Sequence, residues 1–190
     1  MRTLVQEAVA ERLRRAGDET VRLYVAACAE RMAPLFVGLR AGTGGREVDL
    51  DFCVESVHAL WCADRPLADA SDRVGVLEQF PELQPREEGI SDIAETYTFF
   101  AALVLRHALL ANRSGSAEDG VSCGHAALTA TGMLDQNVGG GAFRAEEERL
   151  QLLSVSGDVA GLWEASVRAG RERLRAVLSR TARPPQRFAR

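Results

Sequence analysis

His58 and Cys62 stand four residues apart in a segment with helical apolar spacing, so an imidazole and a thiol could point the same way. Nitrogen and sulfur ligands on one helix face are a common beginning of a zinc site. Nothing nearby supplies an obvious third and fourth ligand, and Cys123 and His125 of "CGH" are badly spaced to share a metal on a helix. We therefore expect no metal and no other cofactor, and keep His58 and Cys62 as the metal candidates. The structural alternative is a buried cysteine near a half-exposed histidine.

The segment "AERMAPLF", residues 29–36, places two opposite charges just before a proline. Glu30 and Arg31 are adjacent, and adjacent side chains on a helix point about 100° apart, so the two cannot face the same neighbouring helix. At least one of them should be partly buried and paired, because an unpaired buried charge is strongly destabilising. Pro34 has no N–H for the carbonyl of Glu30, so the helix should kink or end there. Glu30 and Arg31 are thus a candidate ion pair, structural or ligand-binding.

Asp49, Asp51 and Glu55 gather at the start of a predicted helix, and Asp51 and Glu55 share a face because they are four residues apart. Helix capping and favourable placement near the positive end of the helix dipole explain such a group without any binding role. The run from Glu146 to Glu148 has the same explanation. If either group binds a partner, the simplest partner is a basic protein surface. Association would then be accelerated by charge and sensitive to salt.

Motifs of the common catalytic sites are absent from the sequence. There is no GxSxG nucleophile elbow, "NVGGGAF" lacks the lysine of a phosphate loop, and "GTGG" does not follow a strand. His107, within "LVLRHALL", is predicted to be a hydrogen-bonded histidine at the edge of the core. We predict no catalytic residue and expect the protein not to be an enzyme.

Apolar residues recur every three or four positions along nearly the whole chain, which indicates helices, and no convincing strand is found. Glycine, proline and capping residues divide this pattern into segments. The longest predicted helix runs from Ile90 to Asn112. We predict an all-α, single-domain bundle of about seven or eight helices over residues 1–182, followed by a flexible basic tail at 183–190.

The chain has 190 residues, of which 46% are hydrophobic and 26% charged, as in a soluble protein with one core. Residues 168–190 hold eight arginines and one glutamate, a local charge of +7. Since the whole chain carries -4, the first 167 residues carry -11. An acidic body argues against broad phosphate binding, so nucleic acid is not the expected partner. The basic end is interpreted as a solvated last helix, with an acidic partner or nucleic acid as the alternative.

The four cysteines form no CxxC pair, and three lie in apolar helical patterns, where a free cysteine acts as a small hydrophobe. The first residues lack the pattern of a secretory signal, and no segment approaches the roughly 20 apolar residues of a membrane span. We expect a cytoplasmic protein without membrane contact.

"AACAERMAPLF", the following glycine-containing turn and a helix ending in "HALW" resemble the YjaG-like family of bacterial proteins of unknown function. The resemblance continues at "VLEQF", "FFAALVLRHALL", "CGHAALTATGMLD" and the last helix, so it covers nearly the whole chain at low identity. The positions that carry it best are Glu30, Arg31, Met32, Pro34 and Trp61. This chain departs from the family at Leu35 and Phe36, and in its glycine loop at Gly139–Gly141. The resemblance implies an all-helical fold and assigns no catalytic residue.

"ACAERMAPLF" is also similar to a segment of all-helical immunity proteins from bacterial polymorphic-toxin systems. This shorter resemblance implies a protein that binds and neutralises a toxin. Together with the acidic body, it favours a non-enzymatic cytoplasmic protein that binds another protein, such as a basic toxin domain, through Asp49, Asp51 and Glu55. Two alternatives stay open. One is a small-molecule or metal-binding protein, even an enzyme, with a site near Glu30, Arg31, His58 and Cys62; the other is a homodimer.

Overall fold

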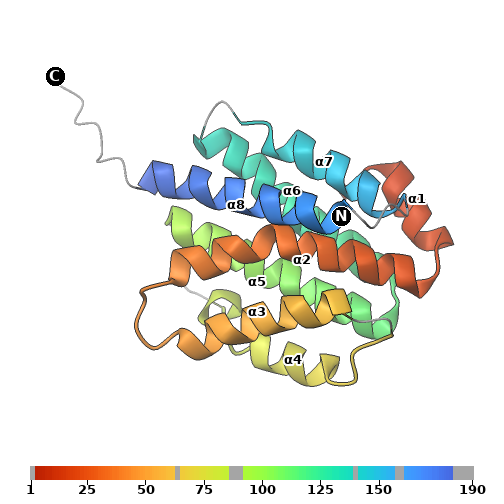
Figure 1. Cartoon of the computed structure of the whole chain (residues 1–190), viewed down its shortest axis with the longest axis horizontal. Coiled ribbons are helices and arrows are strands. Elements are labelled where there is room, and N and C mark those ends of the chain that lie inside the picture. The colour runs from red at the N-terminus through yellow and green to blue at the C-terminus, as the bar shows by residue number, and fades with distance from the viewer. Residues whose placement is uncertain (1–2, 63–64, 86–91, 139–140, 157–160, 182–190) are drawn as a thin grey trace.

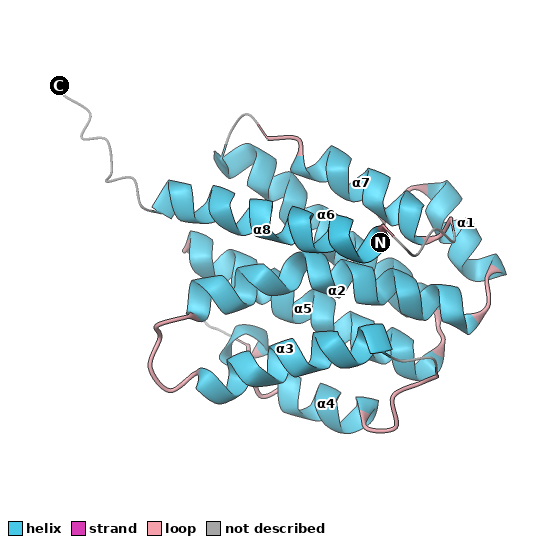
Figure 2. Cartoon of the chain, in the orientation of Figure 1, coloured by secondary structure: helices cyan, strands magenta, loops and turns pink. Residues whose placement is uncertain are grey.

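The computed structural model describes residues 3–62, 65–85, 92–138, 141–156 and 161–181. Within these ranges it contains eight α-helices, one short 3₁₀ helix and no strand (Figure 2). The predicted all-α bundle is confirmed. The α-helices are α1 (Glu7–Arg15), α2 (Asp18–Arg40), α3 (Glu47–Cys62), α4 (Ala70–Leu77), α5 (Ile93–Ser114), α6 (Ala117–Val138), α7 (Phe143–Ser154) and α8 (Leu162–Thr181); the 3₁₀ helix η1 is Pro81–Leu83.

Helix α2 is the centre of the bundle. It contacts α3, α5, α6, α7 and α8, and α3 and α8 lie on either side of it (Figure 1). Its sequence explains this position, since alanine, valine, cysteine and methionine leave almost no polar face between Val21 and Met32. Tyr24, Val25, Cys28 and Met32 are completely buried there. The apolar surface of α2 therefore forms the common core against which the surrounding helices pack.

Helix α5 is the second central element and packs on α2, α4 and α6. It begins at Ile93 and ends at Ser114, close to the predicted range, and Gly115 ends it in the left-handed conformation with φ of 65°. By length and composition α5 could cross a membrane, as buried core helices of soluble proteins also can. Its contacts within the bundle are those of a core helix.

The small residues of α6 allow close approach to α2. A side chain at Gly124 would overlap the hydroxyl group of Tyr24, so only glycine fits at this position. The packing of α6 on α2 and α5 also buries Cys123, Ala127 and Leu128 completely. This approach leaves the carbonyl group of Gly124 within reach of Gln151 on α7.

Several predicted boundaries differ from the observed ones. The first helix starts at Glu7 rather than near Thr3, and α3 starts at Glu47, so Asp49 lies within the first turn and does not cap the helix. The predicted helix from about residue 67 to 80 is reduced to α4, with η1 in the segment bracketed by Pro81 and Pro85. The predicted tail at 183–190 lies outside the described residues.

Candidate functional site

The most highly charged buried site joins three helices that are far apart in sequence. Arg31 of α2, Glu147 of α7 and Arg173 of α8 all have side chains with no exposed surface. We call these three residues the buried ionic cluster. The Nε and Nη2 atoms of Arg31 donate hydrogen bonds to the two carboxylate oxygens of Glu147, both at a distance of 2.8 Å. Nη2 of Arg173 donates to Oε2 of the same carboxylate at 2.7 Å. The Arg31 contact is the two-pronged geometry in which guanidinium and carboxylate groups bind best.

Neutral groups supply further hydrogen bonds around the cluster, whereas Arg173 Nε is buried without a hydrogen-bond partner in the described ranges. Gln151, one turn after Glu147 on α7, donates from Nε2 to Glu147 Oε1 at 2.9 Å and to the carbonyl of Gly124 at 3.0 Å. The hydroxyl of Tyr24 donates to Gln151 Oε1 at 2.8 Å. Nη1 of Arg31 reaches Ser166 Oγ at 3.3 Å. The network therefore ties α2, α6, α7 and α8 together at one point in the interior.

The cluster sets the ionisation of its own carboxylate. Burial alone would raise the pKa of Glu147, but the two guanidinium groups outweigh it and lower that pKa to about 2. Burial alone would lower the pKa of Arg31, and Glu147 instead raises it. Burial raises the pKa of Tyr24 well above its ordinary value, so the phenol stays neutral. Glu147 is therefore ionised at neutral pH, and the cluster carries two positive charges and one negative.

Complete burial limits what the cluster can do. No substrate reaches Arg31, Glu147 or Arg173 without opening the bundle, because none of the three side chains is exposed. A buried charge cluster of this kind restricts which helices can pack together, since a misplaced helix would leave a charge unpaired. Its direct role is to position α7 and α8 against α2.

Pro34 lies inside α2, and the helix continues to Arg40. The expectation that the helix could finish at the proline is therefore wrong. The carbonyl groups near Pro34 are covered by Gly170 of α8. A Cβ atom at Gly170 would lie 3.2 Å from the carbonyl oxygens of both Glu30 and Arg31, and 2.9 Å from Pro34 Cγ. Arg173 Nη1 also donates to the carbonyl of Arg31 at 3.4 Å.

Glu30 and Arg31 do not form an ion pair with each other. Arg31 points inward to Glu147, whereas Glu30 is partly exposed and accepts a hydrogen bond of 2.9 Å from the indole N–H of Trp61 on α3. Burial raises the pKa of Glu30, and the Trp61 hydrogen bond and the charge of Arg171 partly offset this effect. The predicted Glu30–Arg31 pair is therefore not formed. Arg31 belongs to the buried contacts with α7 and α8, and Glu30 interacts near the surface with Trp61 of α3 and with the charge of Arg171 of α8.

A second ionic group, which sequence reasoning missed, holds the turn between α2 and α3. Glu82 of η1 is almost fully buried and accepts hydrogen bonds from Arg40 Nε at 2.8 Å and from Arg46 Nη2 at 2.8 Å. Burial would raise the pKa of Glu82, but the two arginines lower it. Arg46 Nε also donates to Asp49 at 2.5 Å. Asp49 is therefore engaged inside this group and does not belong to a free acidic surface.

The outer face of α3 retains the rest of the predicted acidic group. Asp51 and Glu55 are exposed, as is Glu47 one turn earlier. Two valines on this side of the helix are unusually exposed, Val48 at 79% and Val54 at 53%. We call the residues Glu47, Val48, Asp51, Val54 and Glu55 the α3 face. It combines acidic groups with exposed apolar side chains, a combination that isolated capping residues do not require.

His58 and Cys62 lie further along α3, both exposed, with Cys62 Sγ 3.7 Å from His58 Nε2. Among the described residues no group of three or more His, Cys, Asp and Glu side chains is arranged to hold a metal ion. The interpretation of Cys62 as a buried hydrophobe is wrong, since Cys62 is exposed, whereas Cys28, Cys53 and Cys123 are buried free thiols.

A hollow of about 570 Å³ lies beside α5 and α6 and is lined in part by Phe100, Leu103, His107, Ser122 and His125. Burial lowers the pKa of His107, and its Nδ1 atom is sealed from solvent with no hydrogen-bond partner in the described ranges. The prediction of a hydrogen-bonded His107 is wrong for this atom. Nδ1 of His125 accepts a hydrogen bond from the backbone N–H of Leu4 at 3.0 Å.

Comparison of the chain with models of known protein families, with curated proteins and with solved structures finds no match in any of the three. The resemblance to the YjaG-like family and to immunity proteins therefore rests on the sequence segments themselves.

Proposed function

We propose that the protein works by binding another protein through the α3 face, most concretely as an immunity-type protein that neutralises a basic toxin domain in the cytoplasm. The observation that carries this proposal is the co-location of exposed carboxylates with exposed valines on one helix. Val48 and Val54 give a binding surface apolar contact area, and the acids around them attract a basic partner.

The buried carboxylates and the exposed carboxylates of the protein have different surroundings, and this difference supports a binding role for the exposed ones. Glu147 and Glu82 are buried and held by arginines, so they organise the fold. Asp51 and Glu55 form no ion pair or hydrogen bond within the described ranges, and their negative charge is available to a partner. A rigid helix with unneutralised carboxylates accelerates encounter with a positively charged surface, and this acceleration weakens as salt screens it.

The experiment is a binding titration with the toxin-like product of a neighbouring gene, against wild type, D51R/E55R and the control variant R12E/R15E, which reverses two charges on α1 instead of α3. The proposal expects tight binding by wild type, at least a tenfold loss in D51R/E55R and little change in R12E/R15E. Association should slow as salt rises. Absence of a toxin-like neighbour together with no partner recovered by the full chain would contradict the immunity role. Equal losses in both variants would contradict the α3 face as the binding surface.

A second candidate function is binding of a small organic molecule in the hollow beside α5 and α6. Its apolar wall, formed by Phe100, Leu103 and neighbours, and its two imidazoles suit a partly apolar ligand with one polar group. This location replaces the site near Glu30, Arg31, His58 and Cys62, because Arg31 is buried and Glu30 is engaged by Trp61. Native mass spectrometry of untagged protein tests it: a co-purified small molecule lost in L103W would support this function, and bare protein would count against it.

A further inference from the structure

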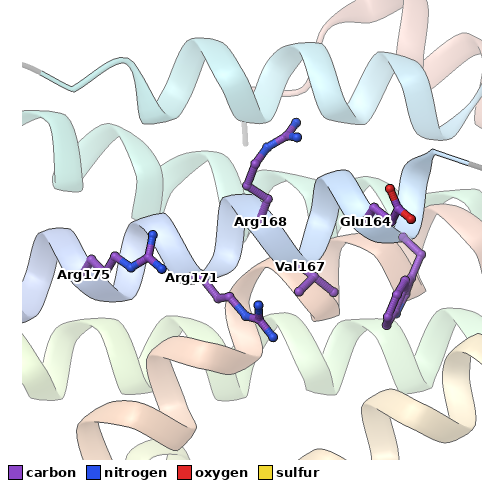
Figure 3. A pocket seen from close by; sticks show the side chains of 6 residues that line it. Glu164, Val167, Arg168, Arg171 and Arg175 are labelled. Atoms are coloured by element: carbon purple, nitrogen blue, oxygen red, sulfur yellow. The ribbon is translucent and has the colours of Figure 1, made fainter.

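The outer side of α8 presents a row of exposed arginines. Arg168, Arg171 and Arg175 follow each other at spacings of three and four residues, and Figure 3 shows them along one helix with Glu164 and Val167. They line a shallow hollow of about 320 Å³ together with Trp163, which is 52% exposed. None of these arginines forms an ion pair or hydrogen bond within the part of the chain that is described. We call Trp163, Arg168, Arg171 and Arg175 the α8 face.

The α8 face and the α3 face lie on either side of α2, and side chains of both α3 and α8 act on Glu30 of α2 (Figure 1). Glu30 of α2 accepts the hydrogen bond of Trp61 from α3, while the charge of Arg171 from α8 acts on the same carboxyl group. In Figure 1, α2 and α8 run in one direction and α3 runs in the opposite direction. The acidic first half of α3 and the arginines in the middle and second half of α8 therefore lie toward the same end of the bundle.

Exposed apolar side chains gather on the same two helices. Among the described residues seven large hydrophobic side chains are exposed, and four of them are on α3 or α8: Val48, Val54, Trp163 and Leu178. Exposed valine and tryptophan beside charged groups are typical of surfaces that bind protein. The two helices thus carry opposite charges and a shared apolar component.

We propose that these two faces bind a second copy of this chain, with the α8 face of each protomer on the α3 face of its partner. A two-fold axis parallel to the helices places α8 opposite α3 of the partner and keeps the same ends of the bundle together. One rotation therefore brings arginines to carboxylates twice, which is the self-complementarity that a symmetric dimer requires. Charge complementarity selects a second copy as the occupant, because the chain itself supplies both signs on one side of the molecule.

The dimer stands independently of the toxin-binding role, since it needs only the two faces. It has a consequence for that role, because both associations use Asp51 and Glu55. A basic partner that occupies the α3 face displaces the second copy, so the two complexes exclude each other.

The test is the molar mass of the full chain in solution, measured by sedimentation equilibrium at low and high salt. We expect about twice the 20.6 kDa of one chain at about 20 mM salt, and a shift toward one chain at about 500 mM, because exposed charge pairs are screened. R171E/R175E and D51R/E55R should each raise the dimer dissociation constant by about tenfold or more. R12E/R15E, with the same change in net charge as R171E/R175E, should leave it unchanged.

The most decisive measurement is the molar mass of a mixture of the two interface variants. R171E/R175E has two acidic faces and D51R/E55R has two basic faces, so each alone should be monomeric and the equimolar mixture should form a one-to-one dimer. A monomeric wild type at low salt and millimolar concentration would overturn the proposal. So would a dimer that survives in both variants, or a mixture that stays monomeric. Circular dichroism of each variant distinguishes a lost interface from a lost fold.

Discussion

Arg31 on α2 and Glu147 on α7 form a two-pronged ion pair in the interior of the bundle, although 116 residues separate them in sequence. Arg173 of α8 binds the same carboxylate from another helix. Two arginines around one glutamate bring three helices to one point and allow few other arrangements of them. The cluster thus contributes chiefly to the specificity of packing, and its effect on stability depends on how it is altered.

Removing only the negative charge should destabilise the protein strongly. In E147Q the two arginines remain buried without a counter-ion, and the free energy of unfolding should fall by about 3–5 kcal/mol. The apolar variant R31M/E147L/R173M removes all three charges and should lie within about 2 kcal/mol of wild type, since it leaves no charge unpaired. Urea unfolding followed by circular dichroism measures both. A small loss of unfolding free energy in E147Q together with a large loss in the apolar variant would contradict this account.

The same cluster predicts how stability responds to acid. The pKa of Glu147 falls from its ordinary value of 4.5 to about 2 on folding, so the folded state favours the ionised form. The stability that this preference contributes is fully present above about pH 4.5 and is lost as the pH falls toward 2. The loss should be on the order of 3 kcal/mol. Urea midpoints between pH 5 and 2 should fall less steeply in R31M/E147L/R173M, and equal slopes would contradict the assignment.

Glu30 should affect the pH dependence of stability in the opposite direction to Glu147. Burial raises its pKa in the folded protein, so its ionised form destabilises the fold and stability improves as the pH falls through that raised pKa. E30Q keeps an oxygen that can accept the Trp61 hydrogen bond and removes the charge. We expect E30Q to be somewhat more stable than wild type at pH 7 and to lose this advantage at low pH. Thermal unfolding at the two pH values checks this, and a less stable E30Q at pH 7 would contradict it.

The helical period of the sequence was enough for the fold class, because apolar spacing at three and four residues is a local signal. The partner of Arg31 is not local. Glu147 stands in a run of three glutamates with similar neighbours, and its burial depends on which face of α7 meets α2. A signal did exist: Glu147, Leu150, Gln151 and Ser154 follow the spacing of a buried face, and all four are buried. Arg173 likewise falls between Ala169 and Val177 on the buried side of α8.

The candidate surface was only partly predictable for a related reason. Asp51 and Glu55 share an exposed face because their spacing fixes their direction on α3. Asp49 does not share this free face, because Arg46 binds it, and that contact depends on the turn that brings Arg46 and Glu82 together. For the arginines of α8 the sequence alone predicts a solvated helix favoured by the helix dipole. Their position beside α2 and α3 follows from tertiary packing alone.

The exposure of the thiols gives a simple chemical check of the fold. Cys62 is exposed, whereas Cys28, Cys53 and Cys123 are buried, and burial raises the pKa of Cys53 to about 12. Only a thiolate reacts rapidly with an aromatic disulfide reagent, so one thiol per chain should react in the native protein and four in denaturant. C62S should abolish the fast native reaction. More than one fast thiol in the native state would contradict the buried positions.

The crossing of α2 and α8 depends on the absence of a side chain at Gly170. A methyl group there would press on Pro34 and on the carbonyl oxygens of Glu30 and Arg31, none of which can move without shifting α2. G170A should therefore lower the free energy of unfolding by about 1–3 kcal/mol, although alanine is the better helix former. Gly75 of α4 is the matched control, because nothing lies within 4 Å of its added Cβ. G75A should raise stability by about 0.5–1 kcal/mol through helix propensity alone. Urea unfolding of the two variants should thus show shifts of opposite sign, and a stabilised G170A would mean that α8 does not approach the Pro34 turn this closely.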